Sequence, residues 1–377
     1  MKRLHFCLLI LLCMILIGCR NEKIVKEPDP SPTNNELSET AENSTLDEKT
    51  VEPLHIQKQA FVRSIGWVNG EEMVYVQFID GMYQFIRYHI HTGEQSVFYE
   101  TDKPFVTAEI SSSNQWIMIH TAPITSSANI VVIDLSGTVM IEKEIPSYEL
   151  MIEWNPYDEN LVFLTAFNEE WTHELYLLNI STNKMQLMEG AEAFLTWSNE
   201  DTWLYQKWNQ DEIQLVSPLY EKGFQKDEKM IGESVFQFDK LEEYLLEIIV
   251  DENDVHSAHY QFTERANSEN PLRFTVPQLD QYSSWLVPFY TIDRHHFFVF
   301  TPYKSGPFDA YQDNFQLISW NLKTGEEEVL FENIKNEPLQ CTSQGTYCLY
   351  GYKGEKLINL KEQEINNFVE MENEVIE

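Results

Sequence analysis

Short runs of apolar residues alternate with polar loops along most of the chain, and this pattern recurs at nearly constant spacing. Each copy has a short apolar segment, a polar loop and then a second, strongly apolar segment. The seven copies are centred on Trp67, Ile110, Trp154, Trp197, Phe238, Thr291 and Thr342. Their spacings are about 43, 44, 43, 41, 53 and 51 residues, and repeats of this length are typical of propellers and solenoids.

The second half of each copy predicts a β-hairpin. Two further apolar segments flank a tight turn at Thr92-Gly93, Ser136-Gly137, Thr182-Asn183 and Thr324-Gly325. Gly and Asn accept the positive φ that such turns need, and the alternation of apolar and polar residues suits strands. Four antiparallel strands in a unit of about 45 residues form a propeller blade. We therefore expect an all-β protein, a β-propeller of four-stranded blades, because a β-sandwich would not explain the repeated phrase.

The repeats set the expected domain boundaries. The propeller is predicted over residues 55–369, followed by an acidic tail over 370–377. Seven blades follow from the repeat count, and six are possible if the first and last copies share one blade. Residues 19–54 are rich in Pro, Ser, Thr, Asn and Glu, which predicts a disordered acidic tether. As a flexible coil it would span on the order of 30 Å.

The N-terminus carries a second pattern, a basic start followed by the apolar run Phe6–Ile17. Twelve helical residues reach only about 18 Å, which is too short for a bilayer core of about 30 Å. A short basic region and a short apolar run are typical of a secretory signal peptide. The ending Leu16–Cys19 is similar to the lipobox of bacterial lipoproteins. That resemblance implies removal of residues 1–18 and lipidation of Cys19; an ordinary signal peptide that contains a Cys is the alternative.

The composition is strongly acidic. The formal net charge is −35, and the loss of Lys2 and Arg3 with the signal makes it −37. Such a chain is expected to repel nucleic acid and anionic lipid headgroups. The lipid on Cys19 is therefore the expected contact with the cytoplasmic membrane, and it places the propeller on the extracytoplasmic face. Solubility alone accounts for the acidity.

Two cysteines remain after the signal is removed and Cys19 is lipidated. Cys341 and Cys348 flank a short segment, "QCTSQGTYCLY". If Gln344-Gly345 is a two-residue hairpin turn, the two cysteines lie directly opposite each other on antiparallel strands, within disulfide reach. A disulfide persists outside the cytoplasm, so we expect one here; two buried thiols are the alternative.

Several phrases resemble known propeller repeats. "EWNPYDENLVFL" and "TWSNEDTWLY" look like the W-S-P-D-G-x-x-L-x-F phrase of TolB-type and WD40-like propellers. With the lipobox and the tether, the chain resembles the YqgU-like lipoproteins of Bacillus-type bacteria. This resemblance implies a six-bladed propeller, in conflict with the repeat count, and carries over only Cys19 as a functional residue. The WD dipeptide and the sialidase S-x-D-x-G-x-T-W box are absent.

Catalytic motifs are also absent from the sequence. It has no G-x-S-x-G, P-loop, G-x-G-x-x-G or C-x-x-C pattern. His89 and His91 would share one strand face and could bind one metal, but nothing nearby supplies a third ligand. An exposed strand face is the simpler interpretation. We therefore expect no metal and no cofactor, and we name no catalytic residue.

Aromatic residues in long loops are the main candidates for binding. The loops between second and third strands lie on one propeller face, and those at 121–129, 166–174 and 301–314 read as long. They carry Trp171, Tyr303, Phe308 and Tyr311, and such rings dominate binding hot spots. In the alternative, each loop folds its ring back onto its own blade. By contrast, the repeat residues Trp67, Trp154 and Trp197 are expected to pack between blades.

Three functions follow for this location. The first is a non-catalytic binding or scaffold module for a protein or cell-envelope ligand. The second is a hydrolase or lyase that acts on wall glycans or peptides with carboxylates at the propeller channel. The third is a sensor or assembly factor without a small ligand.

Overall fold

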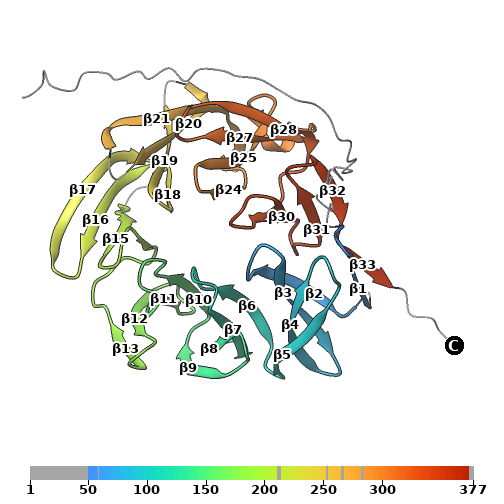
Figure 1. The fold of residues 1–377 in the computed structure, drawn as a ribbon. Coiled ribbons are helices and arrows are strands. Elements are labelled where there is room, and N and C mark those ends of the chain that lie inside the picture. Colours follow the sequence, from blue (N-terminus) through green and yellow to red (C-terminus); the bar gives the residue numbers. More distant parts are fainter. Residues whose placement is uncertain are drawn as a thin grey trace, which may run out of the picture. The chain divides into compact units, whose positions relative to one another are not determined.

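Each repeat folds into one four-stranded antiparallel sheet in the computed structural model (Figure 1). The structure describes residues 50–57, 59–209, 214–251, 254–264, 267–281 and 284–372. Seven such sheets occur in these ranges, the number that the repeat count predicts. The sheets follow one another round a ring in Figure 1, and we number them as blades 1 to 7 in chain order. The all-β propeller prediction is therefore confirmed.

Within every blade the strands pair in chain order, from the innermost to the outermost. The strands are β2 (Phe61–Trp67), β3 (Glu72–Ile79), β4 (Met82–His89) and β5 (Gln95–Thr101) in blade 1; β6 (Phe105–Ile110), β7 (Trp116–Ile124), β8 (Ser127–Asp134) and β9 (Val139–Pro146) in blade 2; β10 (Glu149–Trp154), β11 (Leu161–Phe167), β12 (His173–Asn179) and β13 (Lys184–Leu187) in blade 3; β14 (Thr196–Trp197), β15 (Thr202–Gln206), β16 (Ser217–Gly223) and β17 (Lys226–Val235) in blade 4; β18 (Gln237–Leu241), β19 (Tyr244–Asp251), β20 (Asp254–Glu264) and β21 (Asn267–Pro277) in blade 5; β24 (Tyr290–Asp293), β25 (His296–Pro302), β27 (Phe315–Asn321) and β28 (Glu327–Ile334) in blade 6; and β29 (Leu339–Cys341), β30 (Tyr347–Tyr350), β31 (Lys356–Asn359) and β32 (Glu364–Asn367) in blade 7.

The alternation of side chains along a strand explains how the blades pack. Successive residues of β11 point to opposite faces of the sheet. Val162 and Leu164 are buried against blade 2, whereas Phe163 between them is buried against blade 4. The middle strands are apolar on both faces for this reason, since each blade is covered on both sides.

One apolar cluster fills each boundary between neighbouring blades, and the boundary between blades 7 and 1 has its own. Tyr88 of blade 1 packs there with Leu349 of blade 7 and with Phe368. Trp67 also lies in this cluster, and its indole N–H donates to the Gln340 carbonyl of blade 7. The ring is therefore closed by the same kind of packing that joins the other blades.

The two ends of the folded unit meet at this closing boundary. Strand β1 (Leu54–Gln57) pairs in parallel with β33 (Val369–Glu372). Leu54 is only 1% exposed, and the Tyr88 hydroxyl donates to the Glu52 carbonyl at 2.9 Å. The last residues before the predicted propeller and the first residues of the predicted tail thus belong to the closure.

A small additional sheet accompanies blade 6. It pairs β22 (Leu279–Gln281) with β23 (Ser284–Leu286) and with β26 (Gly306–Pro307). The three-residue 3₁₀ helix η1 (Phe308–Ala310) follows β26. No helix in the described ranges is long and apolar enough to cross a membrane.

Candidate functional site

One face of the ring collects the longer connections. In an antiparallel meander the loop between second and third strands leaves the same end as the connection to the next blade. We call this the rim face, and we call the opposite face, which carries the other turns, the turn face. The rim face carries the exposed side chains of Phe78, Val106, Ile124, Tyr148, Met151, Trp171, Phe194, Phe289, Tyr303 and Tyr352. Among the described turns of the turn face, the exposed large apolar residues are Tyr157 and Phe224.

Trp171 is the most exposed of the rim residues, at 68%. It lies in a turn in which the Asn168 side-chain oxygen accepts the Thr172 N–H at 2.9 Å, and its own φ is +60°. Its ring lies 5.9 Å from that of Phe167, which in turn lies 5.8 Å from Phe194. The turn therefore holds Trp171 at the edge of an aromatic group, where most of its surface remains open to solvent.

The other three predicted binding residues have partners in their own blade. Phe308 and Tyr311 pack against the cluster between blades 6 and 7. The Tyr311 hydroxyl donates to the Asn314 carbonyl at 2.8 Å and accepts the Tyr303 N–H at 3.0 Å. The Tyr303 hydroxyl accepts the Asn333 N–H at 2.9 Å, although its side chain is 44% exposed. These positions match the alternative in which the loop folds back, and a binding role for the three stays a prediction.

Loop lengths differ from the expectation at two sites, and the loop expected at 166–174 spans only residues 168–172. Strands β7 and β8 continue until only Thr125 and Ser126 lie between them, so the long loop expected at 121–129 is wrong. Thr121 pairs with Asn129 in register, and both side chains are buried. Small polar residues such as these predict a loop, but in the structure they belong to paired strands and are buried between packed blades.

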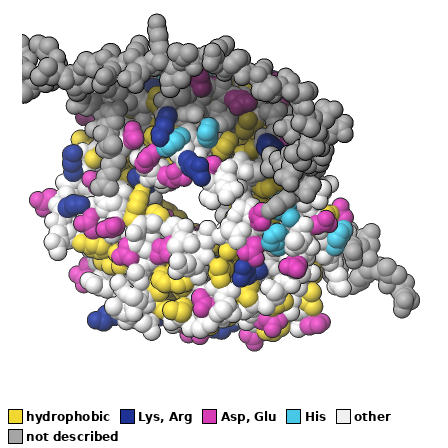
Figure 2. Space-filling model, in the orientation of Figure 1, with side chains coloured by type: hydrophobic (Ala, Val, Ile, Leu, Met, Phe, Trp, Pro, Cys, Tyr) yellow, Lys and Arg dark blue, Asp and Glu magenta, His cyan; other side chains and the backbone are white. Residues whose placement is uncertain are grey.

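The ring surrounds a hollow with charged side chains around it, as Figure 2 shows. A cavity of about 400 Å³ opens at its wall between blades 3, 4 and 5. Glu153, Gln206 and Gln237 supply polar groups to this cavity, and Phe194 and Phe238 supply apolar ones. Its size lies in the range of small-molecule sites.

Glu153, the carboxyl group that lines this cavity, interacts with two carboxyl groups from other first strands. The pKa of Glu153 is raised to about 8, mainly by burial. A hydrogen bond from the Trp197 backbone N–H opposes this rise, and the nearby Glu109 and Asp239 carboxylates contribute to it. Desolvation of its carboxyl group raises the pKa of Glu109 to about 7, although the residue as a whole remains exposed. Burial also raises the pKa of Asp239, which accepts the Tyr290 hydroxyl at 3.0 Å. Near neutral pH, Glu109 and Glu153 can therefore hold or release protons.

Sequence reasoning did not single out these carboxyls. A signal was present, because Glu109 and Glu153 each precede the central residue of their repeat by one position. Acidic residues are so frequent in this chain that the repetition did not stand out.

His89 and His91 lie close together without forming a recognisable metal site. Their ring centroids are 6.1 Å apart. His89 lies 3.4 Å from a Glu71 carboxylate, and His91 hydrogen-bonds the Thr50 carbonyl. Within the described residues, no group of three or more His, Cys, Asp or Glu side chains has the geometry to hold a metal ion.

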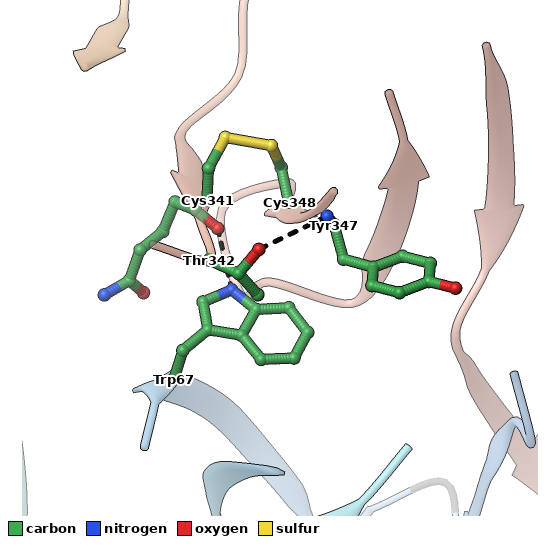
Figure 3. Close-up of a disulfide and its surroundings, with 6 residues drawn as sticks. Trp67, Cys341, Thr342, Tyr347 and Cys348 are labelled. Carbon is green, nitrogen blue, oxygen red and sulfur yellow. Dashed lines mark hydrogen bonds between the residues drawn. A yellow bond between two sulfur atoms is a disulfide. The ribbon is translucent and has the colours of Figure 1, made fainter. Parts of the chain in front are cut away.

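Cys341 and Cys348 form a disulfide in the structure, between the two innermost strands of blade 7 (Figure 3). They are directly opposite in register, with Cα atoms 3.9 Å apart. The two-residue turn expected at Gln344-Gly345 is wrong: the Thr342 N–H donates to the Tyr347 carbonyl, so the connecting loop spans residues 343–346. The register that pairs the two cysteines is nevertheless the expected one. The lipidation residue Cys19 lies outside the described residues.

The chain matches the model of one protein family over most of its length. A family model described as "YqgU-like 6-bladed beta propeller domain" matches residues 89–351. The chain belongs to this family. The YqgU-like match begins at the last residue of β4 and ends just after β30, so it contains blades 2 to 6 whole. The family description names six blades, whereas seven four-stranded sheets occur in the described residues here.

Individual relatives agree with this assignment. The "Uncharacterized lipoprotein YqgU" of Bacillus subtilis (strain 168) is 26% identical over 370 residues, which is 98% of each chain. That name agrees with the lipoprotein prediction. The crystal structure of the uncharacterized protein lmo1340 from Listeria monocytogenes EGD-e has a TM-score of 0.79 at 19% identity, covering 86% of this chain and 98% of that one. An oligogalacturonate lyase from Vibrio parahaemolyticus shares the fold at a TM-score of 0.54 and 12% identity, covering 78% and 86%.

Proposed function

We propose that this YqgU-like propeller is an extracytoplasmic, lipid-anchored binding module that recognises a protein partner through its rim face. The observation that carries this proposal is the set of exposed apolar side chains on that face, with Trp171 at its most exposed point. Exposed apolar patches are a mark of an interaction site, and Trp171 and Phe194 form one here because both rings lie against Phe167.

The arrangement around Trp171 suits a binding anchor. A tryptophan that served only the core would turn its ring inwards, as Trp197 does at 1% exposure. The turn from Asn168 to Thr172 instead fixes the backbone beneath Trp171 through three hydrogen bonds to Asn168. A preorganised ring loses little conformational freedom when it is buried by a partner. Phe194, exposed to 59%, extends the same apolar surface towards blade 4.

The proposed anchor is the lipid on Cys19. The lipoprotein name of the B. subtilis relative and the lipobox-like Leu16–Cys19 support it. Residues between Cys19 and the fold would enter the propeller at β1, where the ends of the folded unit pair. A stable attachment needs more than one acyl chain, which a diacylglyceryl group supplies.

A second candidate is an enzyme acting at the channel. It rests on Glu109 and Glu153, whose pKa values near neutrality would suit general acid and base roles. Hydrolysis or lysis of peptidoglycan fragments by the purified protein, lost in Glu153→Gln, would favour this candidate over the first.

The test of the first candidate is capture from cell envelopes by chemical crosslinking. The lipid-anchored protein is compared with a Trp171→Ser/Phe194→Ser variant and with a control, Met140→Ser. Met140 lies in the outermost strand of blade 2 and is 50% exposed, so the control removes a similar apolar side chain elsewhere. We expect a defined partner that the wild type and the control retain and the rim variant loses. Equal recovery with a folded rim variant would contradict a rim-face site.

A further inference from the structure

A large groove runs along the flank of the ring between blades 3 and 4. Its volume is about 870 Å³, and it lies between β12 and β13 on one side and the strands β15 to β17 on the other. It is separate from the cavity at the channel wall, with which it shares only Leu195. None of the exposed rim residues lines this groove.

The groove exists because the outer part of blade 3 is short. Strand β13 has four residues, all exposed, and it pairs with only part of β12. Residues 188–195 then lead to β14 without forming a strand. Blade 4 instead extends β17 to ten residues. The wall of blade 3 therefore ends where that of blade 4 continues, and the space between them stays open.

Aromatic side chains from blade 4 line the groove. Trp203 is only 4% exposed, and its ring lies 5.1 Å from that of Phe224, which is 42% exposed. Trp67, Trp154 and Trp197 donate their indole N–H groups to backbone carbonyls. The indole N–H of Trp203, by contrast, has no hydrogen-bond partner among the described residues. This nitrogen is not among the fully buried side-chain atoms without a partner in the described residues. Solvent therefore reaches it, and because Trp203 lines the groove its N–H is available to a bound molecule.

The charged groups of the groove are of both signs. Lys207 and Glu228 form an ion pair at 2.5 Å, and the Tyr205 hydroxyl donates to the same carboxylate. Lys222 lines the groove without an ion-pair partner in the described part of the chain, and Glu189 lines it too. Hydrogen-bond donors and acceptors thus surround an aromatic wall.

We propose that this groove binds a neutral oligosaccharide. An acyl chain would remove water from Lys207, Lys222 and Glu228 without replacing their hydrogen bonds, which is costly. A polyanion would meet three glutamates in the groove and a chain of net charge −35. A sugar ring has an apolar face for Phe224 and hydroxyl oxygens that accept from the Trp203 N–H and from Lys222.

The test is an isothermal titration calorimetry experiment on the lipid-anchored protein in a detergent without a sugar headgroup. The probes are chitotetraose and cellotetraose, with tetraglutamate and decanoate as the anionic and acyl alternatives. We expect saturable binding of at least one tetrasaccharide. Phe224→Ala should weaken it by about tenfold through loss of the stacking surface, and Trp203→Phe by about fivefold through loss of one hydrogen bond.

Two controls keep the outcome clear. Met140→Ser, on the outermost strand of blade 2 and away from the groove, should leave the saccharide affinity unchanged. Lys222→Gln changes an exposed strand position and should weaken binding even if Trp203→Phe fails to fold. The proposal is overturned if neither tetrasaccharide binds, if only tetraglutamate or decanoate binds, or if Phe224→Ala and Lys222→Gln bind like the wild type.

Discussion

Replacement of Trp197 tests most sharply how the blades hold together. Its indole is 1% exposed, stacks on Phe163 of the neighbouring blade with centroids 4.1 Å apart, and meets Trp203 edge-on. Its N–H donates to the Glu153 carbonyl at 3.1 Å, so a single side chain joins blades 3 and 4 by both packing and a hydrogen bond.

The expected cost of Trp197→Ala follows from these contacts. Truncation of a buried tryptophan to alanine costs about 3–5 kcal/mol of the free energy of unfolding. Loss of its hydrogen bond contributes about 1 kcal/mol within that range and leaves the Glu153 carbonyl without its donor. Trp197→Phe keeps an aromatic ring beside Phe163, and we expect it to lose about half as much.

Trp171→Ala provides the matched control. It removes the same side chain from the rim, where 68% of it is exposed, and it should change the free energy of unfolding by no more than about 0.5 kcal/mol. Urea unfolding followed by far-ultraviolet circular dichroism measures all three variants, and the midpoint should fall by about 1 M or more for Trp197→Ala. A free energy of unfolding for Trp197→Ala within about 1 kcal/mol of the wild type, or an equal loss in Trp171→Ala, would contradict this role of Trp197.

Three further predictions concern individual groups. Without reductant, Cys341 and Cys348 should resist alkylation, and intact mass would show it; their replacement by Ser should cost about 2–3 kcal/mol, and two alkylated thiols in the untreated protein would disprove the bond. Hydrogen bonds from Ser113 and its neighbour Ser112 hold the pKa of Glu159 below its usual range against the effect of burial. Glu159 therefore stabilises the folded state at neutral pH, and this stabilisation is lost as the pH falls through the pKa of Glu159 in the folded protein. Glu159→Gln should lower the free energy of unfolding at pH 7 and lower it less at pH 3. An equal loss at the two pH values would contradict this prediction. The pKa of Glu153 is raised to about 8, so the stability it contributes is present below pH 4 to 5 and is lost as the pH rises to about 8. The melting temperature of Glu153→Gln should therefore decline less between pH 5 and 9 than that of the wild type. Parallel curves of melting temperature against pH would contradict the raised pKa of Glu153.

The sequence predicted best those parts of the fold that depend on residues close together in the chain. The four-strand repeat could be predicted because alternation and turn residues act locally, and Trp67, Trp154 and Trp197 do pack between blades as their equivalent positions predicted. Residues such as Gly93 and Asn183 adopt the positive φ that their turns required.

Features that join distant segments could not be predicted in this way. The parallel pairing of Leu54–Gln57 with Val369–Glu372 depends on ring closure, which no short window of sequence records. The proximity of Glu153 and Asp239 arises only because separate blades bring their first strands to one channel. Whether a loop aromatic faces solvent was also open, since Trp171 is exposed whereas Tyr311 packs against its own blade.

The measurement that tests the rim-face account most directly is site-specific photocrosslinking in living cells. A photoreactive amino acid replaces Trp171 in one protein and Met140, on the outermost strand of blade 2, in another. We predict a discrete adduct, larger than the uncrosslinked protein, from position 171 that disappears when Phe194→Ser is added. Equal adducts from positions 171 and 140, or none from position 171 in a folded protein, would contradict the proposal that the rim face binds a protein partner.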